Sequence, residues 1–154
     1  MTVFLADEQA ASVAIDELHA LAALVLREEG YPEEAEVTLL LVDESEMMSY
    51  NQRFLDRDGP TDVLAFPLEE LIPGLVPDID ANGPPLSLGD VVIAPSYVQL
   101  QADDHDVTFE DEMALMVTHG ILHLLGYDHT EDEDAERMEA RERQLLALAG
   151  RTRR

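Results

Sequence analysis

The stretch HGILHLLGYDH, residues 119 to 129, decides the fold around it. His119 and His123 stand four residues apart in an apolar helical pattern, so their side chains project from one face of a helix, one turn apart. Gly126 allows the chain to leave the helix and turn, which brings His129 back toward the same point. Three imidazoles at one point suit Zn²⁺, and a fourth position stays open for water, as in catalytic zinc sites.

The spacing of these histidines is similar to the H-x-x-x-H-x-x-G-x-x-H core of the metzincin proteases. Those enzymes carry a glutamate directly after the first histidine as the general base of peptide hydrolysis. Gly120 occupies that position here. The pattern therefore predicts a metal site that lacks the peptidase base.

Length and composition favour one intracellular domain. With 154 residues and 46% hydrophobic content, the chain can bury one core, and we expect residues 1–154 to form a single domain. Because there is no cysteine, a metal must rest on histidines and carboxylates, and no disulfide framework is possible. The N-terminus lacks a signal-peptide pattern, and no apolar run is long enough for a membrane span. We expect a soluble cytoplasmic protein without a membrane partner.

The charge balance is strongly acidic. The chain has 34 acidic and 9 basic residues, a formal net charge of −25, and every basic residue is an arginine. Such a chain repels nucleic acid at long range, so phosphate binding needs a local basic patch. Taken alone, the charge argues against an RNA or DNA partner. A high-salt setting or a surface selected for solubility would also account for it.

Hydrophobic periodicity and capping residues predict the other elements. Helices are expected over 7–29, from an Asp43–Glu46 capping box to Phe54, from Ser96 to Leu100, after a Thr108–Asp111 box, and after a Thr130–Glu133 box. Strands are expected over 36–43, 63–66 and 87–95. The helix after Thr108 carries the first two histidines and is apolar nearly all round, so it should be central and buried.

Several polar segments carry less specific predictions. Residues 68–85 are rich in Pro, Gly and Asp, which favours a mobile surface loop, with a lid over a site as the alternative. Asp58-Gly59-Pro60 is typical of a turn, and Thr61 and Asp62 follow it as turn caps or functional groups. His19 is expected in a surface or packing role, and His105 in a solvated one, with a fourth metal ligand as its alternative. The tail RTRR (151–154) is expected to fray into solvent, with phosphate binding as its alternative.

Three stretches in this order, GPTDVLAFP (59–67), LGDVVIAP (88–95) and the histidine block, resemble the YbeY family of bacterial rRNA-maturation endoribonucleases. The resemblance covers about residues 35 to 148. It implies an α+β domain with a small mixed sheet packed by about five helices. It also implies one Zn²⁺ on His119, His123 and His129. The implied activity is metal-dependent cleavage of single-stranded RNA in 16S rRNA 3′-end maturation and ribosome quality control. The implied partner is ribosomal RNA in the small subunit, not DNA.

The chain departs from this family at one functional position. Many members carry a Tyr-Arg pair five to six residues before the Pro-Thr, and the corresponding residues here are Phe54 and Leu55. Arg53 and Arg57 flank the gap, so either is a candidate for the missing cation. Asp128, beside His129, is a candidate proton acceptor or partner of a metal ligand, with turn capping as its alternative role.

The leading hypothesis is a zinc-dependent phosphodiesterase. Metal-activated water would attack phosphorus, and Arg57 or Arg53 would stabilise the charge of the transition state. One rival is a zinc peptidase, which Gly120 disfavours. The other is a ribosome-assembly factor with a structural zinc, which the missing arginine and the acidic surface favour. Three imidazoles would also bind Ni²⁺ or Cu²⁺.

Overall fold

A computed structural model describes residues 2–59 and 61–154 of the chain, so Pro60 of the predicted turn lies outside the described residues. The elements follow in the order β1 (Thr2–Glu8), α1 (Ile15–Glu28), β2 (Ala35–Val42), α2 (Glu44–Leu55), β3 (Val63–Pro67), β4 (Leu86–Ile93), α3 (Pro95–Asp104), α4 (Phe109–Leu124) and α5 (Asp132–Leu148). The predicted α+β class with a small mixed sheet and five helices is confirmed. None of the described helices is long and apolar enough to span a membrane.

The sheet has four strands in the order β1-β2-β4-β3. β1 and β4 each pair in parallel with β2, and β3 pairs antiparallel with β4. The register of β2 with β4 shifts between Glu36 and Thr38, opposite Gly89, whose φ is +132°. β3 therefore forms one edge of the sheet, and its Leu64 pairs with Val92 of β4.

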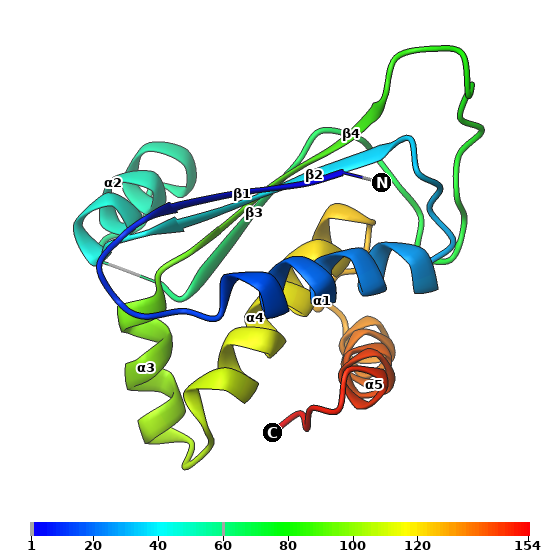
Figure 1. The fold of residues 1–154 in the computed structure, drawn as a ribbon. Coiled ribbons are helices and arrows are strands. Elements are labelled where there is room, and N and C mark those ends of the chain that lie inside the picture. The colour runs from blue at the N-terminus through cyan, green and yellow to red at the C-terminus, as the bar shows by residue number, and fades with distance from the viewer. Residues whose placement is uncertain (1, 60) are drawn as a thin grey trace.

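Helices cover both faces of the sheet. Figure 1 shows α1, α4 and α5 on one side of the sheet and α2 on the other. The larger apolar core lies between the sheet and the first group of helices and includes Leu39, Val91 and Ile121. A smaller core between the sheet and α2 includes Val42, Met47 and Leu64. Alternate residues of β2 and β3 enter opposite cores, as the twofold repeat of a strand requires.

α4 lies at the centre of the larger core. Eleven of its residues are buried, from Glu112 to Leu124, and it packs against α1, α3, α5, β3 and β4. This confirms the prediction of a central, buried helix. Thr108 caps it as predicted, because its side chain accepts a hydrogen bond from the backbone N–H of Asp111. Asp43 caps α2 in the same way, through the N–H of Glu46.

The first strand was not predicted, and the helix predicted over 7–29 was too long. Residues Thr2–Glu8 pair in parallel with Glu36–Val42, and the helix begins only at Ile15. Asp7 and Glu8 therefore belong to β1. The alternating pattern of β1 is weak because only Val3 is buried. His19 of α1 is exposed, as its predicted surface or packing role allows, and its Nε2 lies 2.8 Å from the carbonyl oxygen of Val3 in this strand.

Two predicted helix caps were wrong because their hydroxyls bond elsewhere. α3 begins at Pro95 with Ala94 as its N-cap, and Ser96 Oγ donates instead to Glu44 Oε1 at 3.2 Å. Glu131 occupies the N-cap position of α5, while Thr130 Oγ1 donates to Asp128 Oδ2 at 3.2 Å. Proline at the first helical position needs no hydrogen-bonded N–H, so α3 can begin without a side-chain cap.

The tail RTRR does not fray into solvent, which corrects the prediction. Arg153 Nε donates to Glu142 Oε1 at 2.9 Å, and Arg154 Nε donates to Glu112 Oε1 at 2.8 Å. Both carboxylates are buried, with side-chain exposures of 1%. Buried carboxylates need charged partners, and the tail arginines supply them.

Candidate metal centre

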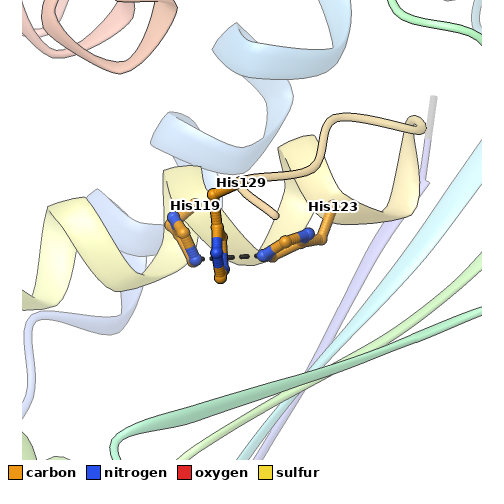
Figure 2. Close-up of side chains that lie close together, drawn as sticks. All are labelled: His119, His123 and His129. Carbon is orange, nitrogen blue, oxygen red and sulfur yellow. Dashed lines mark hydrogen bonds between the residues drawn. The ribbon is translucent and has the colours of Figure 1, made fainter. Parts of the chain in front are cut away.

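The three histidines of the motif converge. His119 and His123 extend from one face of α4, with their Nε2 atoms 3.1 Å apart. The ring of His129 lies 5.4 Å from that of His119 and 4.9 Å from that of His123, measured between centroids. Figure 2 shows the ring of His129, from the segment that follows the helix, next to those of His119 and His123 on one side of the helix. One ligand nitrogen from each histidine lies within 4.8 Å of those of the other two.

A glycine turn brings His129 to this point. Gly126 has a φ of +100° and directly follows the C-cap of α4 at Leu125. Its N–H donates to the carbonyl of His123, and the N–H of Tyr127 donates to the carbonyl of Leu122. A Cβ at position 126 would lie 2.0 Å from the carbonyl oxygen of Leu71. Only glycine fits both the dihedral angle and the close approach of the chain.

The same contact anchors the loop over residues 68–85, which we predicted to be mobile or a lid. Its residue Leu71 crosses the glycine turn, and the Arg137 guanidinium donates to the carbonyl of Pro73 at 3.2 Å. The loop is thus held against the turn that positions His129. It does not line the cavity of the histidines.

Two hydrogen bonds orient the histidines on α4. His119 Nδ1 lies 2.7 Å from Glu142 Oε2 of α5, and His123 Nδ1 lies 2.9 Å from the carbonyl oxygen of Tyr127. Both acceptors require a proton on Nδ1, since a carbonyl and a carboxylate only accept. The Nε2 lone pairs of both rings therefore point toward the shared point. This arrangement is typical of histidines that bind a metal.

The electrostatics favour a neutral His123 and an ionised Glu142. Burial, with the neighbouring His119 and His129, lowers the pKa of His123 to about 4, so its imidazole is neutral at physiological pH. Burial alone would raise the pKa of the Glu142 carboxyl. Hydrogen bonds from His119 and Arg153 outweigh it and hold that pKa below its usual value. Glu142 therefore stays ionised and accepts from His119. The donor set, three imidazoles with fixed tautomers, fits a divalent transition metal.

A cavity of about 410 Å³ opens beside the histidines. Its lining includes the three imidazoles, the edge strand β3 from Val63 to Ala65, and the segment that carries Arg57, Thr61 and Asp62. The position thus gives a metal an open side that small groups can reach. A larger cavity, about 940 Å³, lies against α1 and the start of α4, and none of the three histidines lines it.

Gly120 faces the sheet at very close range. A Cβ there would lie 2.4 Å from Val91 Cγ1 of β4 and 3.4 Å from Val63 Cγ2 of β3. Any side chain at this position would have to displace Val91. The missing peptidase base thus has a steric reason, because the packing of α4 on the sheet requires glycine where metzincins have glutamate.

The predicted catalytic candidates lie in different places. Arg57 lines the cavity together with the histidines. Arg53 lies over two aromatic rings of α2, with its Cζ 5.4 Å from the centroid of Tyr50, and it is not among the residues that line the cavity. Leu55, the position of the family arginine, also lines the cavity.

Asp128 holds the turn next to His129. Its carboxylate accepts a hydrogen bond from the backbone N–H of His129 at 2.7 Å and one from Thr130 Oγ1. The bond from the His129 backbone, supported by Thr130, holds the pKa of Asp128 below its usual value although burial opposes the shift. Asp62 has a similar capping role, because its Oδ1 accepts from the N–H of Val63 at 2.9 Å. Asp62 also lines the cavity.

Glu142 was not predicted from the sequence as part of the site. Its signal lies in the apolar stripe of the last helix, where Met138 and Leu145 are buried and Glu142 stands at helical spacing between them. A charged residue on a buried stripe indicates a buried partner. His105 is exposed at the end of α3 and lies outside the cluster.

The fold and the site define an α+β protein whose central helix and following turn present three histidines suited to a metal. Residues 5–150 match the model of the family described as Endoribonuclease YbeY. The chain belongs to the YbeY family. This confirms the resemblance seen in the sequence.

Relatives and a solved structure agree with this assignment. The chain is 49% identical over 140 residues to an Endoribonuclease YbeY of Acidothermus cellulolyticus, covering 89% of this chain and 84% of the relative. It is 40% identical over 146 residues to one of Mycolicibacterium vanbaalenii, covering 95% and 79%. The solution structure of a Thermotoga maritima protein superposes with a TM-score of 0.64 at 30% identity, covering 97% of this chain and 89% of that one.

Proposed function

We propose that this protein is a zinc-dependent endoribonuclease that hydrolyses phosphodiester bonds in single-stranded RNA. One observation carries the proposal. In a chain of the YbeY endoribonuclease family, three imidazoles with fixed tautomers converge beside an open cavity. Residues 1–154 act as one cytoplasmic domain. Its target is the 3′ end of 16S rRNA in the small ribosomal subunit, during maturation and quality control, and not DNA.

His119, His123 and His129 would hold the ion. A zinc ion held there would supply a Lewis acid and a water of lowered pKa next to the cavity that the histidines line. Glu142 keeps His119 in the orientation that binding needs, and the carbonyl of Tyr127 does the same for His123. Asp128 fixes the backbone at His129 and acts as a positioning residue.

Arg57 supplies the positive charge for the phosphate. It lines the cavity that the histidines also line, and it therefore replaces the family arginine whose position holds Leu55. An arginine there binds a phosphate oxygen and stabilises the charge that develops as water attacks phosphorus and the P–O bond breaks. It also gives the local positive charge that a phosphate needs near a chain with a net charge of −25.

The experiment is cleavage of a single-stranded RNA carrying the 3′ end of 16S rRNA, measured in single-turnover conditions with and without added zinc. We expect cleavage that requires the metal and that His123→Ala abolishes. His105→Ala is the matched control, since His105 is exposed and lies outside the cluster. Unchanged cleavage by His123→Ala would contradict the proposal.

A second measurement separates catalysis from a purely structural role of the metal. If the metal served folding alone, the chelated protein would lose its fold along with any RNA binding. We expect chelated protein to remain folded by circular dichroism while cleavage is lost. Loss of the fold on chelation, with no cleavage in either state, would favour a ribosome-assembly factor instead.

A further inference from the structure

An aromatic cluster lies on α2 and on the edge strand β3, on the face of the sheet opposite α4. The rings of Tyr50 and Phe54 stack with centroids 5.9 Å apart. Phe66 of β3 meets Phe54 edge to face at 5.3 Å. Phe54 nevertheless remains 57% exposed. An exposed ring supported from below by two others presents a fixed, apolar face to solvent.

Arginine accompanies this cluster. The guanidinium carbon of Arg53 lies 5.4 Å from the Tyr50 centroid and 5.2 Å from the Phe54 centroid. Within residues 2–59 and 61–154, neither Arg53 nor Arg57 forms an ion pair with a carboxylate. By contrast, the C-terminal residues Arg151, Arg153 and Arg154 all do. Arg53 and Arg57 can therefore offer their charges to an RNA backbone, which the acidic chain otherwise repels.

The cluster adjoins the cavity of the histidines. Leu55 and Arg57, one and three residues after Phe54, line that cavity. On β3, Ala65 and Pro67 line it as well, and Phe66 between them packs into the aromatic cluster. A flexible single strand of RNA held at the histidines can therefore pass round the edge strand β3 and reach the exposed ring of Phe54. Figure 1 shows α2 on the opposite side of the sheet from α4, with β3 between them.

Stacked aromatic rings next to an arginine can bind nucleobases by stacking. Every base has a π-face, so an aromatic platform holds bases without reading their edges. The bases must be unstacked to reach it, which a double helix does not allow. Phe54 carries no hydrogen-bonding group, so it adds affinity without sequence selectivity.

We propose that the platform formed by Tyr50, Arg53 and Phe54 stacks nucleobases of single-stranded RNA next to the phosphodiester held at the histidines. The proposal rests on the proposed endoribonuclease function. It makes the platform the part of the protein that selects single strands. Arg57 acts on the phosphate in the cavity, whereas Arg53 binds the neighbouring nucleotide.

The chain contains no tryptophan, so Phe54→Trp creates a single fluorescent reporter on the platform. Single-stranded RNA is titrated with chelator present, so that binding is measured without cleavage. We expect quenching by the RNA and little quenching by an oligonucleotide of the same length whose bases are removed. Phe4→Trp is the matched control, because Phe4 is 51% exposed and lies on β1 at the other edge of the sheet.

Equal quenching of the two reporters, or equal quenching by the abasic strand, would overturn the proposal. Either result would favour the exposed rings as a surface for a protein partner instead. Cleavage kinetics give an independent readout. Phe54→Ala should raise KM by about 5- to 150-fold, the range for loss of one stacked base, with kcat little changed, and Phe54→Trp should restore it. An unchanged KM in Phe54→Ala would also count against the platform.

The outcomes distinguish this proposal from the proposed function. If the reporter on the platform is quenched by RNA but no cleavage occurs with any metal, the platform stands and the nuclease assignment fails. If wild-type protein cleaves RNA while Phe54→Ala cleaves with the same KM, the nuclease assignment stands and the platform fails. Arg53→Gln should weaken binding and reduce its salt dependence, with Arg143→Gln as the control on an exposed arginine of α5.

Discussion

The Glu142 carboxylate lies 2.7 Å from Nδ1 of His119, although 23 residues separate the two in the chain. Glu142 is buried, and its other oxygen accepts from Arg153 of the tail. The orientation of a ligand on α4 therefore depends on α5 and on the C-terminal arginines. A metal held by His119 would thus be linked through this one carboxylate to the docking of the last helix.

Glu142→Gln should weaken metal binding by about 10- to 100-fold, the usual cost of losing a partner of a ligand histidine. The glutamine amide can still accept a hydrogen bond from His119. It carries no negative charge, however, so it no longer raises the basicity of the imidazole. Competition with a chromophoric chelator measures the affinity. Glu136→Gln is the control, since Glu136 is on the same helix and is exposed. Equal affinities of the two variants would show that the contact has no role in binding.

Added zinc should stabilise the protein. At free zinc 100 times the dissociation constant, binding contributes about 2.7 kcal/mol, which for a domain of this size raises Tm by roughly 5 to 10 °C. His129→Ala should abolish most of the shift, and His105→Ala should preserve it. Differential scanning calorimetry with and without zinc checks the result. A full shift in His129→Ala would place the metal elsewhere.

Gly120→Ala should destabilise the fold although alanine is the better helix former. Alanine gains about 1 kcal/mol in a helix interior. However, its Cβ would lie 2.4 Å from Val91 Cγ1, and such overpacking costs about 1–3 kcal/mol. In a Val91→Ala background the clash disappears, so the same substitution should become neutral or stabilising. Urea unfolding of the four proteins in this double-mutant cycle tests the change of sign.

Arg154→Ala should destabilise the protein by about 2–3 kcal/mol, because it leaves the buried carboxylate of Glu112 without its partner. The expected cost is less than for a fully buried pair, since the Arg154 side chain is 30% exposed. Arg143→Ala is the control, because its pair with Glu139 is exposed and should contribute less than about 0.5 kcal/mol. Equal unfolding midpoints in urea would contradict the prediction.

Ala65→Pro should fold nearly as well as wild type, whereas Leu64→Pro should not. The bonds from Ala94 N to Asp62 O and from Leu68 N to Leu88 O fix which residues of β3 bond to β4. In an antiparallel pair, hydrogen-bonded and non-hydrogen-bonded residue pairs alternate along the strands. The backbone of Leu64 therefore bonds to that of Val92, and the N–H of Ala65 points to the free edge of the sheet. Proline is tolerated at such an edge position. Leu64→Pro would leave a buried carbonyl unpaired, at about 1–3 kcal/mol. Thermal unfolding separates the two variants.

The sequence predicted the parts of this structure that local patterns determine. The three histidines could be placed because helical spacing and a glycine turn are local features. The caps at Asp43 and Thr108 were predicted because each bonds within its own first turn. β1 was missed, since a half-exposed edge strand is stabilised by pairing with β2, which no local pattern shows.

The parts that sequence could not predict depend on distant contacts. Glu142 contacts His119 only because α5 packs on α4. The arginines of the tail are ordered because they bond to the buried carboxylates of Glu142 and Glu112. The same holds for the candidate cations. Arg53 and Arg57 are equivalent in the sequence, yet one lies over aromatic rings and the other lines the cavity.

The contact between Gly120 and Val91 also limits how this site can change in evolution. A carboxylate at position 120 would need the volume that the valine of β4 now fills. A peptidase could therefore not arise here by one substitution at the helix. The strand residue would have to shrink as well, at a cost in stability. Neither substitution alone would give a peptidase, and each alone would destabilise the fold.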